Sequence, residues 1–351
     1  MNKILVTGGC GFIGAHTIVD LIENGFEPVC VDDNSRSTIA LLNGIKKITG
    51  VQVKNYKVDL KNFDDTYAIF QENTDIQGII HFAAYKAVGE SVDKPLMYYE
   101  NNLFSLINIL KCATEFKVPH FIFSSSCTVY GSPDKIPVTE TTPIKPAESP
   151  YGATKQMGEE IVKNVTVSDD LKSILLRYFN PVGAHPSTLI GELPLGKPEN
   201  LVPAITQTAI GKIKQLSGYG DDYPKRDGSC IRDYIHVCDI AHAHTLALQY
   251  LIAEKNVDKC EVFNLGTGNG ISVLEAINTF EKVSGKKLNY KIAPRRPGDI
   301  MAIYADNSLA KEKLNLDPKY TLDDMMDTAW KWELKLHQDD ALHNVPNFEM
   351  N

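Results

Sequence analysis

Two residues near the middle of the chain could together move a proton. The segment from Ser149 to Lys155 reads Ser-Pro-Tyr-Gly-Ala-Thr-Lys, and Pro150 favours a helix that begins here, because proline suits a first helical turn. Tyr151 and Lys155 then lie one turn apart on one face. Tyrosine titrates near pH 10, and one positive charge about 4 Å away contributes roughly 4 kcal/mol, which would bring its pKa near 7. The pair is therefore predicted to accept a proton at neutral pH; an ordinary surface helix is the alternative.

A glycine-rich turn near the N-terminus is a candidate phosphate site. The predicted strand Lys3–Thr7 runs into Gly-Gly-Cys-Gly-Phe-Ile-Gly, and a helical pattern follows. Glycines let the backbone approach a pyrophosphate, and the helix N-terminus offers unpaired N–H groups. The spacing is G-x-x-G-x-x-G rather than G-x-G-x-x-G, so the prediction depends on the strand–turn–helix context. The cofactor residues predicted in this turn are Gly8, Gly11, Phe12, Ile13 and Gly14.

The residues after the second predicted strand distinguish between dinucleotides. Asp32 lies about 20 positions beyond the turn, where a carboxylate binds ribose hydroxyls and repels a 2′-phosphate. This favours NAD over NADP, although the guanidinium of Arg36 could hold the additional phosphate. The neighbouring residues predicted to contact the cofactor are Asp33, Asn34, Ser35, Arg36 and Ser37.

Further cofactor residues are predicted where other strands end. Asp59, followed by Leu60, ends the third predicted strand and could meet the adenine amino group; a helix-leading aspartate is the alternative. Residues that follow the carboxyl end of a parallel strand commonly contact ligands. After the fourth predicted strand these residues are Phe82, Ala83, Ala84 and Lys86.

Short apolar runs alternate with helix-length segments, which predicts an α/β fold with a Rossmann-type, doubly wound parallel sheet. The predicted strands are Lys3–Thr7, Pro28–Asp32, Val53–Val58, Gly78–Ala83, His120–Ser125, Ser173–Phe179 and Glu261–Leu265. The predicted helices are Gly11–Asn24, Phe63–Glu72, Pro95–Phe116, Tyr151–Lys163, Leu201–Lys214, Val237–Ala253, Ser272–Val283 and Leu322–Leu336.

Gly- and Pro-rich text after residue 180 breaks the alternation and predicts a smaller mixed α/β lobe. We therefore expect an NAD-binding domain over residues 1–180, onto which part of 236–265 packs. A substrate lobe over 181–338 and a tail over 339–351 complete the division.

Composition narrows the class of protein. The 351 residues carry a formal charge of −8, with 43% apolar residues, which argues against a nucleic-acid or membrane-surface binder. The seven cysteines include no C-x-x-C pair, and buried reduced thiols are the expected state. No signal peptide is apparent and no apolar run reaches the roughly 20 residues of a membrane span. The cytoplasm is the expected compartment, and no metal site is predicted.

The chain resembles the extended short-chain dehydrogenase/reductase family, and within it the epimerases of nucleotide sugars. The resemblance runs from Lys3 to about Leu336. It is carried by His81-Phe82-Ala83, by Lys86-Ala87-Val88-Gly89-Glu90-Ser91 and by Ser124-Ser125-Ser126-Cys127-Thr128-Val129-Tyr130-Gly131. It is also carried by the ten residues from Arg177 to Pro186, by Arg232-Asp233-Tyr234-Ile235-His236-Val237 and by Ala293-Pro294-Arg295-Arg296.

The resemblance implies NAD-dependent interconversion of UDP-galactose and UDP-glucose through a 4-keto sugar. Tyr151 would be the base at the sugar 4-hydroxyl, Ser126 would bind the same oxygen, and Lys155 would hold the nicotinamide ribose and lower the pKa of Tyr151. Asn101 and Phe179 would seat the nicotinamide. The NAD would stay bound and be recycled, and the protein would be a homodimer.

The resemblance also implies a firmly held nucleotide and a loosely held sugar. Guanidinium groups suit phosphate oxygens, so arginines are expected at the UDP diphosphate. The residues expected to contact substrate, besides Ser126 and Tyr151, are Asn180, Asn200, Leu201, Ser217, Tyr219, Arg232, Arg296, Asp299 and Ile303.

Departures from the pattern bear on competing functions. Cys127 and Thr128 stand where similar 4,6-dehydratases carry an Asp-Glu pair, and a thiol and a hydroxyl cannot replace a carboxylate in proton transfer. At Ile303 related epimerases carry Tyr, or a small residue when they accept N-acetylated sugars, so plain hexoses are favoured. Epimerisation of UDP-GlcNAc/UDP-GalNAc or of UDP-pentoses stays open, as does a dinucleotide-sensing regulator without catalysis.

Overall fold

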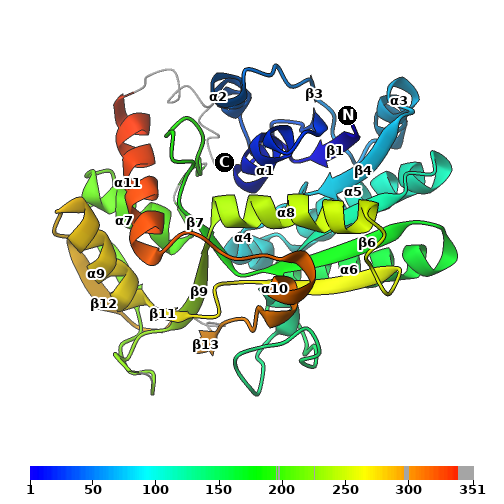
Figure 1. Ribbon diagram of the computed structural model, residues 1–351. Helices are drawn as coiled ribbons and strands as arrows, with labels where there is room; N and C mark the ends of the chain where they lie inside the picture. The colour runs from blue at the N-terminus through cyan, green and yellow to red at the C-terminus, as the bar shows by residue number, and fades with distance from the viewer. Residues whose placement is uncertain (195, 197, 225, 296–299, 339–351) are drawn as a thin grey trace.

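The larger part of the molecule is built around a parallel sheet (Figure 1). The computed structural model describes residues 1–194, 196, 198–224, 226–295 and 300–338. Seven strands are hydrogen-bonded in the order β10-β6-β5-β4-β1-β2-β3, and every neighbouring pair is parallel. The strands are β1 Lys3–Thr7, β2 Glu27–Val31, β3 Asn55–Tyr56, β4 Ile76–His81, β5 His120–Ser126, β6 Lys172–Tyr178 and β10 Cys260–Leu265. The doubly wound α/β fold class is confirmed.

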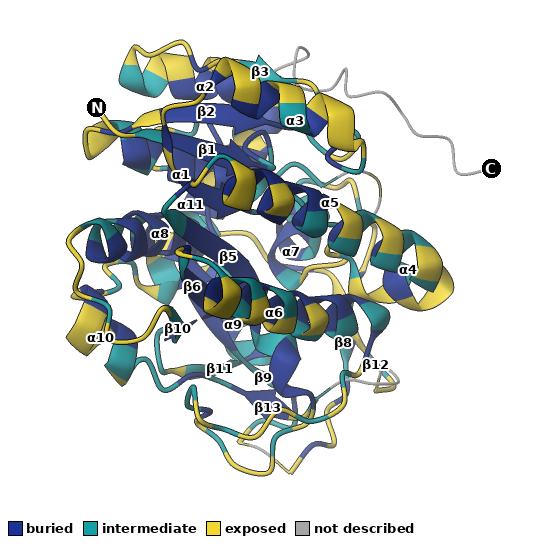
Figure 2. Ribbon diagram, turned by 90° about the vertical axis from the view of Figure 1, so that its right-hand side faces the viewer, coloured by how far each residue is buried: buried dark blue, intermediate teal, exposed yellow. Residues whose placement is uncertain are grey.

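Helices cover both faces of this sheet (Figure 2). Ile4 and Val6 of β1 pack on one face, whereas Leu5 packs on the other, as expected for a strand whose side chains alternate. The first face is covered by α1 Phe12–Glu23, α2 Ala40–Thr49 and α8 Val237–Ile252; the second by α3 Phe63–Glu72, α5 Pro95–Glu115 and α6 Pro150–Ser168. Burial on both faces explains why the strands are nearly continuous apolar runs.

The order of the strands fixes where a ligand can bind. From β1 the chain adds β2 and β3 on one side, then returns to place β4, β5 and β6 on the other. The connections after β1 and β4 therefore diverge, and this reversal opens a crevice at the carboxyl ends of the strands. The glycine turn and Phe82–Lys86 follow strand ends at this edge, and the serine run forms the end of β5 there.

A smaller lobe is built around β9 (Ile231–His236). It pairs with β7 Asn180–Val182, β11 Gly270–Ser272 and β13 Ala302–Ile303, and a separate pair joins β8 Leu216–Tyr219 to β12 Tyr290–Ala293. Apolar side chains of α7 Leu201–Ala209, α9 Val273–Ser284 and α11 Leu322–Gln338 form its core. The segment that contains α8 and β10 returns to the large sheet. The division into two domains at residue 180 stays a proposal.

Several predicted element ends differ from the structure. The third strand is only Asn55–Tyr56, so Asp59 lies beyond it rather than at its end. The predicted helix Leu201–Lys214 stops at Ala209, because Gly211 adopts φ +91° and leaves the helical conformation. Helix α2 was not predicted; its N-cap, Ile39, makes no side-chain cap. Also unpredicted were α4 Val88–Asp93, the 3₁₀ helix η1 Cys127–Tyr130 and α10 Ser308–Leu314.

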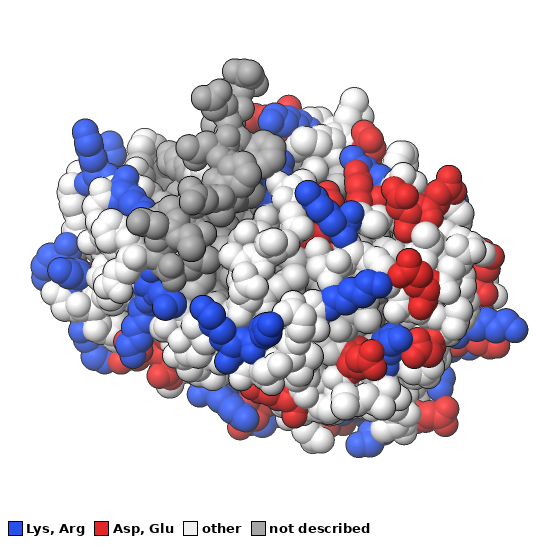
Figure 3. Space-filling view, turned by 90° about the horizontal axis from the view of Figure 1, so that it is seen from above, with Lys and Arg blue, Asp and Glu red and all other residues white. Residues whose placement is uncertain are grey.

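Two properties of the surface and helices are relevant to the expected partners. Acidic and basic side chains lie near one another on the face seen in Figure 3. Within the described part of the chain, no helix combines the length and apolar character needed to cross a membrane. Nor do the described residues include a group of three or more His, Cys, Asp or Glu that could hold a metal ion.

Candidate active site

The serine run and the predicted catalytic helix meet at the end of β5. Helix α6 begins at Pro150, and Ser149 caps it by accepting a hydrogen bond from Gly152 N at 3.1 Å. One turn later, Lys155 Nζ donates to the Ser124 carbonyl at 2.6 Å. The Tyr151 hydroxyl is hydrogen-bonded to the Ser126 side chain. All three predicted catalytic side chains, Ser126, Tyr151 and Lys155, are thus brought together and buried.

The electrostatics of this pair differ from the expectation. Burial raises the pKa of Tyr151, and the hydrogen bond from Ser126 opposes this shift only in part. Burial lowers the pKa of Lys155 to about 8, opposed by the charge of Glu159. Lys155 Nζ lies 5.9 Å from the centre of the Tyr151 ring. The expectation that Lys155 alone brings the tyrosine pKa near neutrality is therefore wrong, because desolvation of the phenolate outweighs the charge at this distance.

The glycine turn has the geometry of a phosphate cradle. Gly8 adopts φ +70°, and a Cβ on Gly14 would lie 2.3 Å from Gly8 O, so these positions require glycine. A Cβ on Gly11 would meet only Gly8 O within 4 Å, which leaves the outer side of the turn open. Gly11 is the N-cap of α1 and makes no side-chain cap. Phe12 and Ile13 form the first turn of this helix, whose N–H groups suit an anion.

Asp32 is held immediately after β2. Its carboxylate accepts hydrogen bonds from Cys10 N at 3.0 Å and Asn34 N at 3.0 Å, and from Ser37 Oγ at 2.6 Å. Burial raises the pKa of Asp32, and these hydrogen bonds oppose the shift. Asp33 instead accepts from the Ser35 amide and hydroxyl. The loop therefore presents one buried carboxylate beside the glycine turn, as a ribose site requires.

Arg36 is committed to another partner. Its two terminal nitrogens donate to the two carboxylate oxygens of Glu90 at 2.7 and 2.9 Å, and its guanidinium lies 4.4 Å from the centre of the Tyr85 ring. A bidentate pair of this kind is the preferred arrangement of a guanidinium with a carboxylate. With Arg36 occupied by Glu90, the case for a 2′-phosphate, and hence for NADP, is weakened.

The remaining predicted cofactor residues are distributed around the same edge. Asp59 is exposed and accepts from Lys61 N, whereas Leu60 is buried in the sheet core. Phe82 packs 4.6 Å from the His244 ring. Asn101 Nδ2 donates to Asn102 Oδ1 at 3.0 Å. The others are Ala83 and Ala84, half-buried beyond β4, and Phe179, buried beyond β6.

The predicted substrate residues lie mainly on the smaller lobe. Arg232 of β9 donates to the carbonyls of Ile231 and Ile300, and Ile303 of β13 is its partner in register. Ile303 is buried with Phe179 in a small apolar cluster. The rest comprise Asn180 at the start of β7, Asn200 and Leu201 at the start of α7, and Ser217 and Tyr219 on β8. Arg296 and Asp299 lie outside the described residues.

Three carboxylates that contact predicted site residues were missed in the sequence. Glu192 Oε1 accepts from Lys86 Nζ at 3.0 Å and from Asn200 Nδ2 at 3.1 Å, and so joins the two halves of the molecule. Glu90 binds Arg36, and Glu159 lies near Lys155. Only Glu159 had a usable signal, because it is four residues beyond Lys155 and so on the same helix face.

The two positions that distinguish dehydratases carry no ionised acid. Burial raises the pKa of the Cys127 thiol to about 12, so it is neutral at physiological pH. Thr128 Oγ1 is buried and has no hydrogen-bond partner. Neither group can take the part of a carboxylate in a dehydration.

Comparison with known proteins identifies the family. The model of a family described as GDP-mannose 4,6 dehydratase matches residues 5–329. A protein named UDP-glucose 4-epimerase from Bacillus subtilis (strain 168) is 47% identical over 331 residues, which cover 94% of this chain and 96% of that protein. The chain belongs to the UDP-glucose 4-epimerase family.

Solved structures extend this family assignment to the fold. A UDP-glucose-4-epimerase from Stenotrophomonas maltophila, crystallised with NAD and formylated UDP-arabinopyranose, superposes with a TM-score of 0.93 at 42% identity, covering 96% of this chain and 99% of that one. The epimerase from Bifidobacterium longum, in complex with NAD+ and UDP, gives 0.90 at 45% identity, covering 95% and 98%. The predicted family membership and fold are thus confirmed, and both of these related structures contain the predicted dinucleotide, NAD or NAD+.

Proposed function

We propose that this chain interconverts UDP-galactose and UDP-glucose by transient oxidation of the sugar at C4. The proposal rests mainly on one observation. Ser126, Tyr151 and Lys155 meet at the carboxyl-terminal edge of the sheet, where the glycine turn and Asp32 also lie. A base beside a dinucleotide site suits removal of hydrogen from a secondary alcohol. Removing hydrogen and returning it to the opposite face exchanges the two sugars without net oxidation.

Each catalytic side chain has a distinct task. The Tyr151 oxygen takes the proton of the 4-hydroxyl, and Ser126 Oγ holds the same sugar oxygen. Lys155, fixed by the Ser124 carbonyl, binds the nicotinamide ribose and is cationic below pH 8. NAD+ bound here supplies the hydride acceptor and a positive charge beside the phenol. The proton that Tyr151 accepts returns to the sugar oxygen when the 4-keto sugar is reduced.

The smaller lobe would hold the nucleotide. Arg232 suits the diphosphate, as Arg296 does by the same chemistry. Tyr219 would lie against uracil and Asp299 would bind its ribose, while Ser217, Asn180, Asn200 and Leu201 complete the contacts. A firm grip on UDP leaves the sugar able to turn over between the two hydride transfers.

UDP-pentoses are a second candidate substrate class, supported by one related structure and by the size of Ile303. The structure from Stenotrophomonas maltophila contains a UDP-pentose derivative, and Ile303 is intermediate in volume between the residues found in related enzymes of different sugar size. Epimerisation of UDP-pentoses is therefore the second candidate. The test is competition between UDP-galactose and a UDP-pentose for the same enzyme.

We further propose a homodimer through α5 and α6. Leu96 and Phe104 of α5, Met157 of α6 and the neighbouring Ile144 are exposed apolar side chains. Ile144 and Met157 line a shallow groove of about 600 Å³. Apolar patches of this kind mark protein interfaces. Light scattering should give twice the chain mass; a monomer would exclude this interface.

The cytoplasm remains the proposed compartment, since all seven cysteines are free thiols, which suits a reducing environment.

The proposed reaction has a direct test. The purified protein, incubated with UDP-galactose and no added NAD, should yield UDP-glucose, because the bound cofactor is regenerated in each cycle. Chromatography of the products reports the conversion. A requirement for stoichiometric reduction of added cofactor would exclude the mechanism.

A further inference from the structure

Three consecutive residues of β5 contact three residues of α6. The Ser124 carbonyl accepts from Lys155 Nζ at 2.6 Å, and the Ser126 side chain is hydrogen-bonded to Tyr151. Between them, Ser125 Oγ donates to Glu159 Oε1 at 2.6 Å. Glu159 lies one turn beyond Lys155, so the contacts follow one face of the helix. The middle contact involves no group that the proposed chemistry uses.

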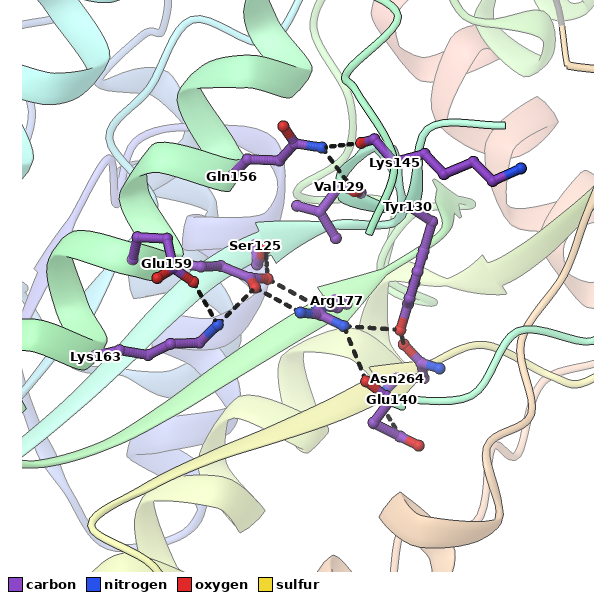
Figure 4. Close-up of polar contacts among 11 residues, drawn as sticks. Ser125, Val129, Tyr130, Glu140, Lys145, Gln156, Glu159, Lys163, Arg177 and Asn264 are labelled. Atoms are coloured by element: carbon purple, nitrogen blue, oxygen red, sulfur yellow. Dashed lines mark hydrogen bonds and ion pairs between the residues drawn. The ribbon is translucent and has the colours of Figure 1, made fainter. Parts of the chain in front are cut away.

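Glu159 is itself firmly held (Figure 4). Arg177 donates to its two carboxylate oxygens from Nε at 2.8 Å and from Nη2 at 2.6 Å. Both side chains of this pair are buried, and Arg177 on β6 is the register partner of Ser125 on β5. The carboxylate of α6 is therefore bound to two adjacent strands at one level of the sheet.

The arginine continues the network away from the helix. Its Nη1 donates to the Tyr130 hydroxyl at 3.1 Å, and this hydroxyl donates to Asn264 Oδ1 at 2.6 Å. Asn264 Nδ2 in turn donates to the Val138 carbonyl. Figure 4 shows these side chains in one row from α6 across the sheet. The network thus fixes η1, which directly follows Ser126, as well as the end of β5.

We infer that Glu159 is a positioning residue: through Ser125 it pins the end of β5 to α6, and so fixes Ser126 Oγ relative to the Tyr151 hydroxyl. The inference rests on the proposed function. During the reaction the sugar presents first one face and then the other, so the two hydrogen transfers need the protein groups and the bound cofactor to stay in place. A small change in the separation of these hydroxyls would affect both transfers.

A purely structural role does not account for the arrangement. Buried ion pairs contribute little to stability relative to apolar replacements, and the Arg177–Glu159 pair is complete without the Ser125 hydroxyl. Ser125 is one residue from Ser126 and donates its hydroxyl to the helix that carries the base. The bond therefore lies where it constrains catalytic geometry.

The test is Ser125→Ala, with Ser173→Ala as matched control. Ser173 is also a buried serine, on β6, and its hydroxyl also bonds to α6, at Thr166 Oγ1 (2.8 Å), but near the other end of the helix. We expect Ser125→Ala to lower kcat about tenfold, since small displacements of catalytic groups are costly, with KM for UDP-galactose unchanged. Ser173→Ala should leave kcat unchanged, and both should lower the unfolding midpoint alike.

A second readout is independent of turnover. When Ser126 and Tyr151 are misplaced, the 4-keto sugar leaves before it is reduced, so reduced nicotinamide accumulates on Ser125→Ala during incubation with UDP-galactose. Its near-ultraviolet absorbance should rise in this variant and stay at the wild-type level in Ser173→Ala. Equal kcat and equal absorbance in the two variants would overturn the inference.

A double variant removes the carboxylate without leaving a buried charge. Glu159→Met with Arg177→Met replaces the ion pair by apolar chains of similar length, which proteins commonly tolerate. It should fold, and it should lose kcat as Ser125→Ala does; wild-type kcat in a folded double variant would overturn the inference. An inactive wild-type protein would instead contradict the proposed function, so the two failures are distinct.

Discussion

The two sides of the candidate site differ in how firmly they are built. On the catalytic side, Ser126, Tyr151 and Lys155 are each at most 9% exposed and belong to β5 and α6, a strand and a helix of seven and 19 residues. On the substrate side, β7 has three residues and β13 has two, and Asn200 is exposed. The catalytic residues thus belong to one long strand and one long helix that are well buried, whereas the predicted substrate residues are spread over several shorter elements, among them β9 with six residues and α7 with nine.

This difference suits a reaction in which the substrate moves and the catalyst does not. A sugar that turns over needs a site that grips it lightly, whereas two opposite hydrogen transfers need one fixed set of groups. Changes on the catalytic side should therefore alter kcat, and changes on the lobe should alter binding.

The largest effect is expected for Tyr151→Phe. The change removes only a hydroxyl, so the buried ring and its packing remain, but the proton acceptor is lost. We expect kcat to fall about 10³-fold, as for loss of a general base, while calorimetry finds UDP affinity unchanged. Turnover near the wild-type rate would exclude Tyr151 as the base. A parallel loss of UDP affinity would show that the catalytic side also contributes to nucleotide binding, against the division of roles between the two sides.

Arg232→Lys tests the lobe. Lysine keeps the positive charge but lacks the guanidinium fork that suits diphosphate oxygens and the two carbonyls bound here. We expect the dissociation constant for UDP to rise about 10- to 100-fold, corresponding to loss of one or two charge-assisted hydrogen bonds. The kcat at saturating substrate should change much less. If kcat fell as far as affinity, Arg232 would belong to the catalytic side.

Ile303 tests the size of the sugar site. Ile303→Ala would open space beside Phe179 and should raise kcat/KM for UDP-GlcNAc about tenfold, the lower end of what one methylene group in a pocket is worth. The same change should cost about 2–4 kcal/mol of stability, because Ile303 is buried in an apolar cluster. Ile303→Tyr, the matched control, should lower activity on the acetylated sugar. Unaltered preference in both variants would show that position 303 does not limit sugar size.

Much of the catalytic side could be predicted from sequence because it depends on local patterns. Pro150 fixes the start of α6, and the spacing from Tyr151 to Lys155 then fixes their common face. The glycine turn and Asp32 follow from one strand–turn–helix unit. The pKa of Tyr151 differs from the prediction, because the sequence does not reveal how deeply a phenol is buried.

The rest depends on contacts between distant segments. Glu90 and Arg36 are 54 residues apart, and Glu192 and Lys86 are 106 apart, so no local pattern announces either pair. The strands of the lobe are equally hard to see, because β7, β11 and β13 have three residues or fewer. Elements so short carry too little periodicity to be distinguished from loops.

A change in stability with pH, which should leave activity on the substrate side untouched, tests what burial of the catalytic lysine costs. Burial lowers the pKa of Lys155 from 10.5 to about 8. Below pH 8 it is protonated in both the folded and the unfolded protein, and the full cost of burying its charge is present. Between pH 8 and 10.5 the unfolded chain binds the proton and the folded protein does not, so wild-type stability rises with pH, by up to about 1.4 kcal/mol per unit.

The variant Lys155→Met lacks this titration. Its free energy of unfolding relative to wild type should therefore decline by roughly 3 kcal/mol from pH 7 to 10.5, measured by urea denaturation. If the difference in free energy of unfolding were the same at both pH values, Lys155 would keep an ordinary pKa. Burial of its charge would then not destabilise the folded protein.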